Sequence, residues 1–165
     1  ETFSRVLTAT KSEKSLWDFV NTEQTSVVIG KHIIKGKSDI RRMTNKTSTS
    51  YELKTRVRVD DREFRDFNIR AAEAREETIE ISDKDWAKSY IPSLQRDRKR
   101  YSFFDKTKVW RLDLTEVETY NESVLQFSYE IELEYISKSK LISIVNIETI
   151  VSYILQKIQN SDVVI

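Results

Sequence analysis

The alternation of hydrophobic and polar positions predicts a helix followed by a series of strands. Apolar residues recur at helical spacing between positions 3 and 20, which indicates an N-terminal helix. Residues 25–34 are rich in β-branched side chains and predict a strand, and a short strand is expected over 39–44. Residues 51–59 alternate strictly, with charged side chains at the even positions up to Arg58. Period two is typical of a strand with one polar face.

The second half of the chain predicts more strands and a final helix. Five further strands are expected, over residues 64–75, 77–81, 97–104, 108–119 and 124–136. Residues 82–95 contain the only proline and predict a long connection with a helical turn around Trp86. Asn146 is placed to cap a last helix, in which apolar residues from 147 to 158 form a stripe on one face. Such a stripe is more typical of core packing than of a partner site.

These elements predict a fold dominated by β-structure, with about eight antiparallel strands and a helix at each end. Many strands carry charges of both signs on one face, which leaves two architectures open. An open antiparallel sheet would expose its charged face to water. A closed barrel would turn the charged faces inward and cover the apolar faces with helices. Residues 1–165 suit a single domain in either case.

Composition narrows the possible chemistry. The chain has 28 basic and 27 acidic residues, so contact with a polyanion requires local clustering of charge. Cysteine is absent and the single histidine, His32, lies in an apolar stretch, which excludes thiolate and multi-histidine metal sites. A metal would need carboxylate ligands, which suit Mg²⁺ or Mn²⁺. No segment is typical of a membrane span or a signal peptide, so we expect an intracellular protein without membrane contact.

An acidic row near the C-terminus is the clearest chemical feature. Glu130, Glu132 and Glu134 alternate with apolar residues and therefore share one face of a strand. Three carboxylates in a row repel one another unless cations or basic side chains compensate, and a divalent ion would do so. The alternative is an acidic exposed face that protects the sheet against aggregation.

Two basic rows precede the acidic row. Alternation places Arg96, Arg98, Arg100 and Ser102 on one face of a strand, and it places Arg111, Asp113 and Thr115 on one face of the next strand. Guanidinium groups suit a chain of phosphates because each can donate two parallel hydrogen bonds. Arg70, followed by small alanines, and the even face of residues 54–58 could extend such a surface. A structural lattice of ion pairs is the alternative.

In this order the motifs resemble the triphosphate tunnel metalloenzymes, above all the RNA 5′-triphosphatases of fungal, protozoan and large-DNA-virus mRNA capping. Arg98-Lys-Arg100-Tyr-Ser102-Phe, Arg111-Leu-Asp113-Leu-Thr115-Glu116-Val117 and Tyr129-Glu130-Ile-Glu132-Leu-Glu134 are similar to three successive strands of that family. Asn68-Ile-Arg70 followed by Glu73 resembles an earlier strand more loosely.

The resemblance implies a closed tunnel of about eight strands that hydrolyses the γ-phosphate of 5′-triphosphate RNA, the first step of capping. It implies Mg²⁺ or Mn²⁺ held by Glu130 and Glu134, with Glu132 positioning the attacking water and Asp113 orienting a basic side chain. Arg100 would act in catalysis and binding. The implied phosphate-binding residues are Arg70, Arg96, Arg98, Arg100 and Arg111. A guanylyltransferase domain or subunit is an implied partner, and recognition of DNA sequence is not expected.

One family feature is not found. The family carries a Glu-x-Glu pair on a first strand near its N-terminus, so we expect that strand to lie upstream of residue 1 or the site to have degenerated. Two alternative functions stay open: hydrolysis of inorganic polyphosphate or a small organic triphosphate, and an inactive barrel that binds RNA ends or docks a guanylyltransferase. A viral protein would work in the host cytoplasm or virion, and a cellular capping enzyme in the nucleus.

Overall fold

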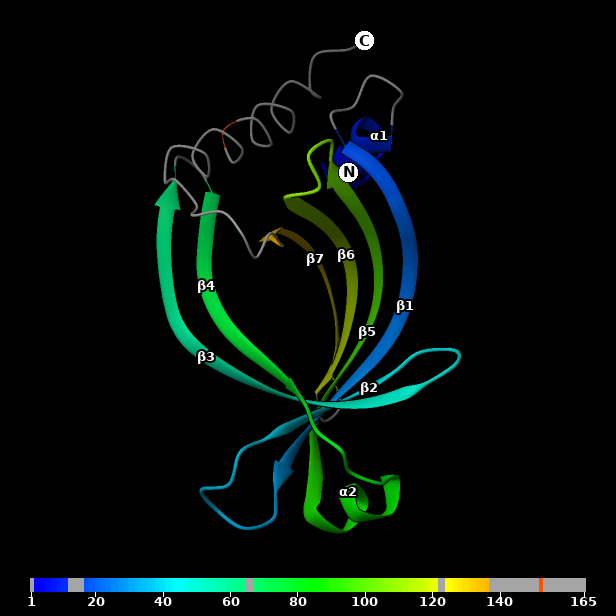
Figure 1. Cartoon of the computed structure of the whole chain (residues 1–165), viewed down its shortest axis with the longest axis vertical. Helices are drawn as coiled ribbons and strands as arrows, with labels where there is room; N and C mark the ends of the chain where they lie inside the picture. Colours follow the sequence, from blue (N-terminus) through cyan, green and yellow to red (C-terminus); the bar gives the residue numbers. More distant parts are fainter. Residues whose placement is uncertain (1, 12–16, 65–66, 122–123, 137–151, 153–165) are drawn as a thin grey trace. The chain divides into compact units, whose positions relative to one another are not determined.

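A computed structural model describes residues 2–11, 17–64, 67–121, 124–136 and 152 of the chain. Two helices and seven strands lie in this part (Figure 1). They are α1 (Thr2–Lys11), β1 (Trp17–His32), β2 (Ile40–Thr44), β3 (Thr49–Phe64), β4 (Phe67–Thr78), α2 (Asp83–Ser89), β5 (Tyr90–Asp105), β6 (Trp110–Asn121) and β7 (Val124–Tyr135). Neither helix is both long enough and apolar enough to cross a membrane.

The strands form one sheet with the order β4-β3-β2-β1-β5-β6-β7. The pairs β1–β2, β2–β3 and β3–β4 are antiparallel, and the β3–β4 register shifts between Arg56 and Arg58. Within the described residues β4 and β7 are the two ends of the order. The expectation of a mostly antiparallel β-fold is confirmed. The described residues contain seven strands, whereas about eight were expected in a closed barrel, and the order of these seven is not closed.

The N-terminal helix is shorter than the sequence predicts. It ends at Lys11, and β1 begins at Trp17, so the prediction of helix up to position 20 is wrong. The cause is tertiary packing: Trp17 is buried in the core, and the ring of Phe19 lies 5.5 Å from that of Phe103. Residues 17 and 19 therefore follow strand periodicity, although their spacing also fits a helix.

Three other boundaries differ from prediction. β5 begins at Tyr90 instead of residue 97, and so includes Pro92. β3 continues through Asp60-Asp61 to Phe64, because its backbone stays in register with β4, with Asp61 opposite Arg70. The separate strand expected over 77–81 is absent from the described part, since β4 runs without a break from Phe67 to Thr78. The expected last helix lies outside the described residues.

Contacts divide the chain into two compact units. Unit 1 comprises Glu1–Glu23, Lys99–Val117 and Ser128–Ile165. Its core combines two residues of α1 with residues of β1, β5 and β6. These are Phe3, Val6, Trp17, Tyr101, Phe103, Trp110, Leu112 and Leu114. Because successive side chains of a strand point to opposite faces, α1 covers the apolar face of this unit and the charged residues share the other face.

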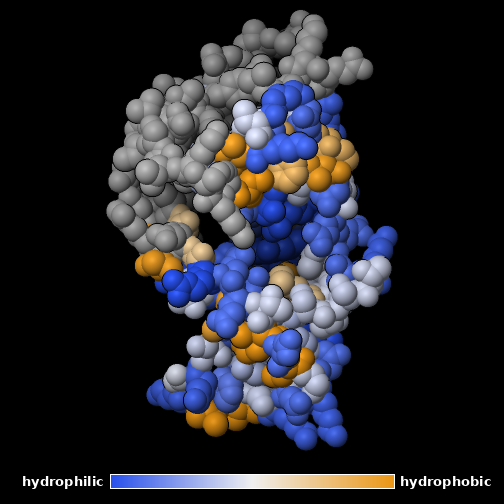
Figure 2. All heavy atoms as spheres, in the orientation of Figure 1, coloured by the Kyte–Doolittle hydropathy of each residue, from blue (hydrophilic) through white to orange (hydrophobic). Residues whose placement is uncertain are grey.

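Unit 2 comprises Gln24–Arg98 and Glu118–Phe127. Its core forms around Trp86 of α2, with Ile40, Tyr51 and Tyr90. The Ser82 hydroxyl oxygen accepts a hydrogen bond from the Asp85 amide at 3.1 Å and so caps α2. On the face that Figure 2 shows, the described residues are mainly hydrophilic, with separate apolar patches, as expected for a chain with 33% charged residues.

Gly30 allows β1 to approach the Trp86 ring closely. A Cβ at this position would lie 2.7 Å from Trp86 Cζ2 and 2.9 Å from Tyr90 Cβ. We expect Gly30→Ala to reduce the free energy of unfolding by about 1–3 kcal/mol, because a packed core cannot accommodate an added methyl group. Urea denaturation measures the loss.

A double-mutant cycle supplies the control for this expectation. Trp86→Phe removes the ring atom nearest to the added methyl group, so the penalty of Gly30→Ala should shrink in that background by at least about 0.5 kcal/mol. An equal penalty in both backgrounds would contradict the close approach.

Candidate active site

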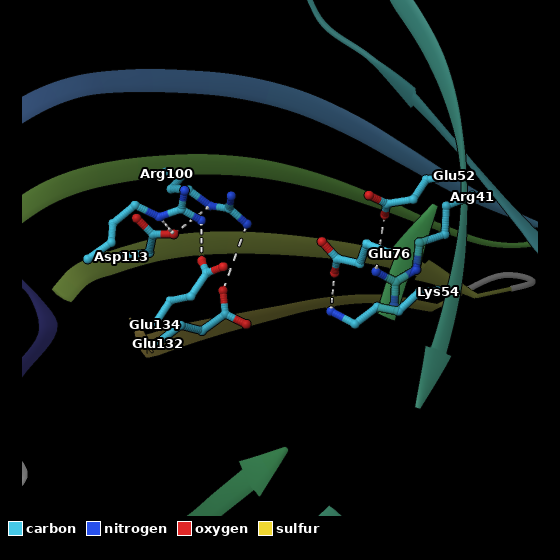
Figure 3. A network of polar contacts seen from close by, with 9 residues as sticks. Arg41, Glu52, Lys54, Glu76, Arg100, Asp113, Glu132 and Glu134 are labelled. Atoms are coloured by element: carbon cyan, nitrogen blue, oxygen red, sulfur yellow. Dashed lines mark hydrogen bonds and ion pairs between the residues drawn. The ribbon is translucent and has the colours of Figure 1, made fainter. Parts of the chain in front are cut away.

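Alternation on β5, β6 and β7 gathers a charged set on one face of unit 1. The set lies opposite the core residues of the same strands, such as Leu112 and Leu114. It contains Arg100 of β5, Arg111 and Asp113 of β6, and Glu132 and Glu134 of β7. Figure 3 shows the side chains of Arg100, Asp113, Glu132 and Glu134 pointing toward one another. We call these five residues the Asp113 cluster.

Asp113 is the centre of this cluster. Its side chain is buried, and the residue is only 2% exposed. The Nε of Arg111 donates a hydrogen bond of 3.1 Å to Asp113 Oδ2, and the Nε of Arg100 lies 3.7 Å from the same oxygen. One carboxylate therefore holds two guanidinium groups side by side, and a buried carboxylate is retained only with such partners.

The same two arginines also reach the acidic row of β7. Arg111 Nη2 donates to Glu134 Oε2 at 2.5 Å, and Arg100 Nη2 lies 3.8 Å from Glu132 Oε2. Each arginine thus bridges Asp113 and one glutamate, and Figure 3 labels Arg100 in this position. The two glutamate side chains are about half exposed, at 55% and 53%. Their ion pairs are weak compared with the buried one because water screens them.

Two buried polar atoms of β6 have no hydrogen-bond partner among the described residues. They are Asp113 Oδ1 and the hydroxyl oxygen of Thr115. Both side chains belong to the polar face of β6, since the residues are two positions apart. Buried polar atoms are satisfied in the great majority of cases. These two can therefore accept a hydrogen bond from a further donor at this place.

The carboxylates of unit 1 suit an open metal site. In the part of the chain that the structure describes, no three His, Cys, Asp or Glu residues are grouped closely enough to hold a metal by themselves. Mg²⁺ is commonly held by one or two carboxylates, with waters and substrate phosphates as the other ligands. The half-exposed oxygens of Glu132 and Glu134 have the right chemistry for that mode, and Glu130 lies on the same face of β7.

A second charged cluster lies in unit 2. Arg41 of β2 and Glu52 of β3 are register partners, with Arg41 Nη1 3.9 Å from Glu52 Oε2. Two residues further along β3, Lys54 lies opposite Glu76 of β4, with Lys54 Nζ 2.6 Å from Glu76 Oε1. Figure 3 shows these four residues as another group of alternating charge.

Glu52 is the electrostatically perturbed member of that group. Burial raises the pKa of the Glu52 carboxyl, and the neighbouring carboxylate of Glu76 raises it further. The positive charges of Arg41, Lys54 and Arg98 act against the rise in this pKa without cancelling it. Three basic side chains therefore act on one half-buried carboxylate.

The structure divides the predicted site residues between the two units. Arg100, Arg111, Asp113, Glu132 and Glu134 form the Asp113 cluster, and Glu130 belongs to the same unit. Arg96 and Arg98 lie on β5 in unit 2. Arg70 lies on β4 opposite Asp61, but its side chain is outside the described part. The roles of all these residues in binding or catalysis stay predictions.

Sequence reasoning missed Arg41. It lies on a five-residue strand whose charges show no clean alternation, and only the pairing with β3 places it beside Glu52. β1, the first described strand, contains the acids Asp18 and Glu23 and no Glu-x-Glu pair.

No protein-family model matches the chain, and no curated protein matches it. Solved structures do resemble it. The RNA triphosphatase Pct1 of S. pombe, in complex with the Spt5 CTD, superposes with a TM-score of 0.62 at 15% identity, covering 81% of this chain and 54% of that one. Another structure of Pct1 gives 0.59 at 13% identity and covers 98% and 59%. The chain shares its fold with these two structures.

A similar fold also occurs outside that enzyme. The PH1819 protein of Pyrococcus horikoshii superposes with a TM-score of 0.55 at 14% identity, covering 98% of this chain and 84% of that one. The chain spans somewhat more than half the length of the two Pct1 structures. These likenesses agree with the tunnel fold that the resemblance of the sequence motifs implies. They concern the fold alone.

The buried position of Asp113 gives a prediction on stability. Asp113→Asn removes the charge shared by Arg100 and Arg111 and should reduce the free energy of unfolding by about 1–3 kcal/mol. Urea denaturation at neutral pH measures this change. Asp18→Asn is the matched control, because its pair with Lys106 is more than half exposed and should contribute no more than about 0.5 kcal/mol. Equal losses in both variants would contradict the central role of Asp113.

The raised pKa of Glu52 predicts a pH dependence. The pKa of this carboxyl is higher in the folded state than in the unfolded state. The protein therefore loses stability as the pH rises from the unfolded-state pKa through the folded-state pKa. Glu52→Gln does not titrate, so its melting temperature should exceed that of the wild type at neutral pH. The difference should vanish below about pH 4, where both side chains are neutral. Calorimetry across this range, with the exposed Glu77→Gln as control, tests the direction.

Proposed function

We propose that the chain binds the 5′-triphosphate end of RNA and hydrolyses its γ-phosphate, as the first step of mRNA capping. The observation that carries the proposal is the Asp113 cluster, in which one buried carboxylate holds two arginines beside a row of glutamates. A row of guanidinium groups suits adjacent phosphates, and nearby carboxylates suit a divalent cation. The proposal includes the closed tunnel of about eight strands that the motifs imply.

In this proposal the arginines exchange partners when substrate binds. Arg100 and Arg111 keep their pairing with buried Asp113, which fixes their position. They release the half-exposed Glu132 and Glu134 and donate to phosphate oxygens instead. Donors that are already in position need little reorganisation when charge develops on those oxygens. Asp113 therefore acts as a positioning residue and the arginines contact the substrate.

The released glutamates take the other roles. Glu134 and Glu130 would hold Mg²⁺ or Mn²⁺, and the cation would neutralise charge on the phosphate oxygens. Glu132, on the same face between them, would accept a proton from the attacking water and orient it toward the γ-phosphorus. The attack would be in line with the β–γ bridging oxygen, whose bond to the γ-phosphorus breaks, so that the RNA leaves as its 5′-diphosphate. The phosphate-binding set proposed from the sequence also includes Arg70, Arg96 and Arg98.

A second candidate function is binding of RNA ends without hydrolysis. One observation favours it: β1, the first described strand, carries no Glu-x-Glu pair. A domain of this kind would keep the arginine donors of the Asp113 cluster, and its task could be to present RNA to a guanylyltransferase.

The test is release of γ-phosphate from 5′-triphosphate RNA by the purified chain, with and without Mg²⁺ or Mn²⁺. Inorganic tripolyphosphate serves as the competing substrate. Metal-dependent release with a preference for RNA supports the proposal. A preference for tripolyphosphate supports a polyphosphatase on the same fold. Tight binding of triphosphate RNA with no release supports the second candidate.

Glu134→Gln tests the assigned chemistry. We expect a loss of turnover on the order of 100-fold or more, because the amide carries no charge for the cation. The melting temperature should change little, since this ion pair is half exposed. Glu116→Gln is the control, because Glu116 lies on the opposite face of β6 and accepts a hydrogen bond from Tyr101. Full turnover by Glu134→Gln would remove this residue from the mechanism.

A further inference from the structure

The turn between β1 and β2 is a concentrated basic segment. Residues 31–38 contain three lysines, Lys31, Lys35 and Lys37, and no acidic residue. All three side chains are exposed. The whole chain has a net charge of only +1, so this is a local excess of the kind that contact with a polyanion requires.

Hydrogen bonds fix the backbone of this turn. The Ile33 amide donates to the Ser89 carbonyl at 2.8 Å, which ties the turn to the end of α2 (Figure 1). The Ile34 amide donates to His32 Nδ1 at 3.0 Å, and the Lys37 amide donates to the Ile34 carbonyl at 3.2 Å. Gly36 supplies the positive φ of 84° that the turn needs. The lysines are therefore held on an ordered backbone, which lowers the entropy lost on binding.

Strand register connects the turn to the charged cluster of unit 2. Ile29 of β1 lies opposite Arg41 of β2, and Arg41 lies opposite Glu52 of β3. Lys31 is two residues beyond Ile29, so it lies on the same face of the sheet as Arg41. Diagonal neighbours of this kind are about 7–8 Å apart. Lys31 thus continues the basic row from Arg41 toward Lys35 and Lys37, and Asp39 ends the acid-free segment.

We propose that Lys31, Lys35 and Lys37 form a track for the RNA chain that follows the 5′-triphosphate. The inference rests on the proposed function, in which RNA is the substrate, and the residues that carry it, Arg41 and the three lysines, all lie in unit 2. Lysine binds backbone phosphates as a point charge and reads no sequence. Three lysines would contact several successive backbone phosphates of a longer RNA, whereas a dinucleotide has only one such phosphate and tripolyphosphate has none. The track would therefore distinguish RNA from small triphosphates.

The turn also exposes two aliphatic side chains, Ile33 and Ile34, at 55% and 61%. Aliphatic groups do not stack on bases as aromatic rings do, so these residues contribute nothing to the track. They would suit an apolar protein partner instead. The continuity of Lys31 with the face of Arg41 favours RNA, and the experiment separates the two possibilities.

The test compares two 5′-triphosphate RNAs, of two and of twenty nucleotides, in binding to the 165-residue chain. Fluorescence anisotropy without divalent cations measures affinity independently of turnover. The double variant Lys35→Ala/Lys37→Ala should bind the longer RNA about ten-fold more weakly and the dinucleotide as the wild type does. The slope of log affinity against log salt should fall by about 1.4, at roughly 0.7 for each lost contact with a single strand.

Lys46→Ala is the matched control, because Lys46 is an exposed lysine in the next turn along the chain, between β2 and β3. It should bind both RNAs as the wild type does. The track is overturned if the double variant binds the longer RNA normally, loses affinity equally for both RNAs, or matches the control. It is also overturned if Ile33→Ser/Ile34→Ser causes the same loss with an unchanged salt slope, since the contact would then be apolar.

Failure of the proposed hydrolysis is distinguishable from failure of the track. Absence of phosphate release from both triphosphate RNA and tripolyphosphate rejects the hydrolysis. The length-dependent binding is measured without turnover, so it still decides whether the turn holds RNA.

Discussion

The buried carboxylate of Asp113 allows two arginines to share one face of a sheet. The guanidinium groups of Arg100 and Arg111 repel each other, and they reach the same Asp113 oxygen only because that side chain is fixed from the opposite side. Its neighbours in the chain, Leu112 and Leu114, are fully buried in the core of unit 1. Burial of these two leucines therefore sets the register of β6, and the register places Asp113 between the arginines.

The ion pairs of the Asp113 cluster differ in exposure, and this difference would decide which of them break when a polyphosphate binds. Arg100 and Arg111 each have acidic partners, so a polyphosphate would have to displace carboxylates in order to bind them. The pairs with Glu132 and Glu134 are half exposed and weak, whereas the pair with Asp113 is buried. In the proposed mechanism a substrate would exchange with the glutamates and leave the Asp113 contacts in place. The freed glutamates would then be available to a cation beside the phosphates.

The sequence predicts the C-terminal half of this arrangement well, because strict alternation in 108–119 and 124–136 fixes both the strands and the face of each charge. Prediction from the sequence fails where the spacing of apolar residues fits both a helix and a strand. Trp17 and Phe19 suit a helix and a strand equally, and packing against Phe103 decides the outcome. Arg41 was missed for another reason: its strand is short, and its neighbours on β1 and β3 are set by long-range pairing that no local pattern encodes.

The comparisons show why function has to be argued from charges instead of from the fold. At 13–15% identity, what this chain shares with Pct1 and with the Pyrococcus protein is a pattern of strands. Such a pattern can keep the polar face of each strand while the residues on it change. The Asp113 cluster suits any chain of phosphates, so it cannot by itself select RNA. Selectivity has to come from groups that contact the RNA chain itself. Lys31 lies on the same face as Arg41, and Lys35 and Lys37 follow it in an ordered turn, so these lysines are the groups we propose for that contact.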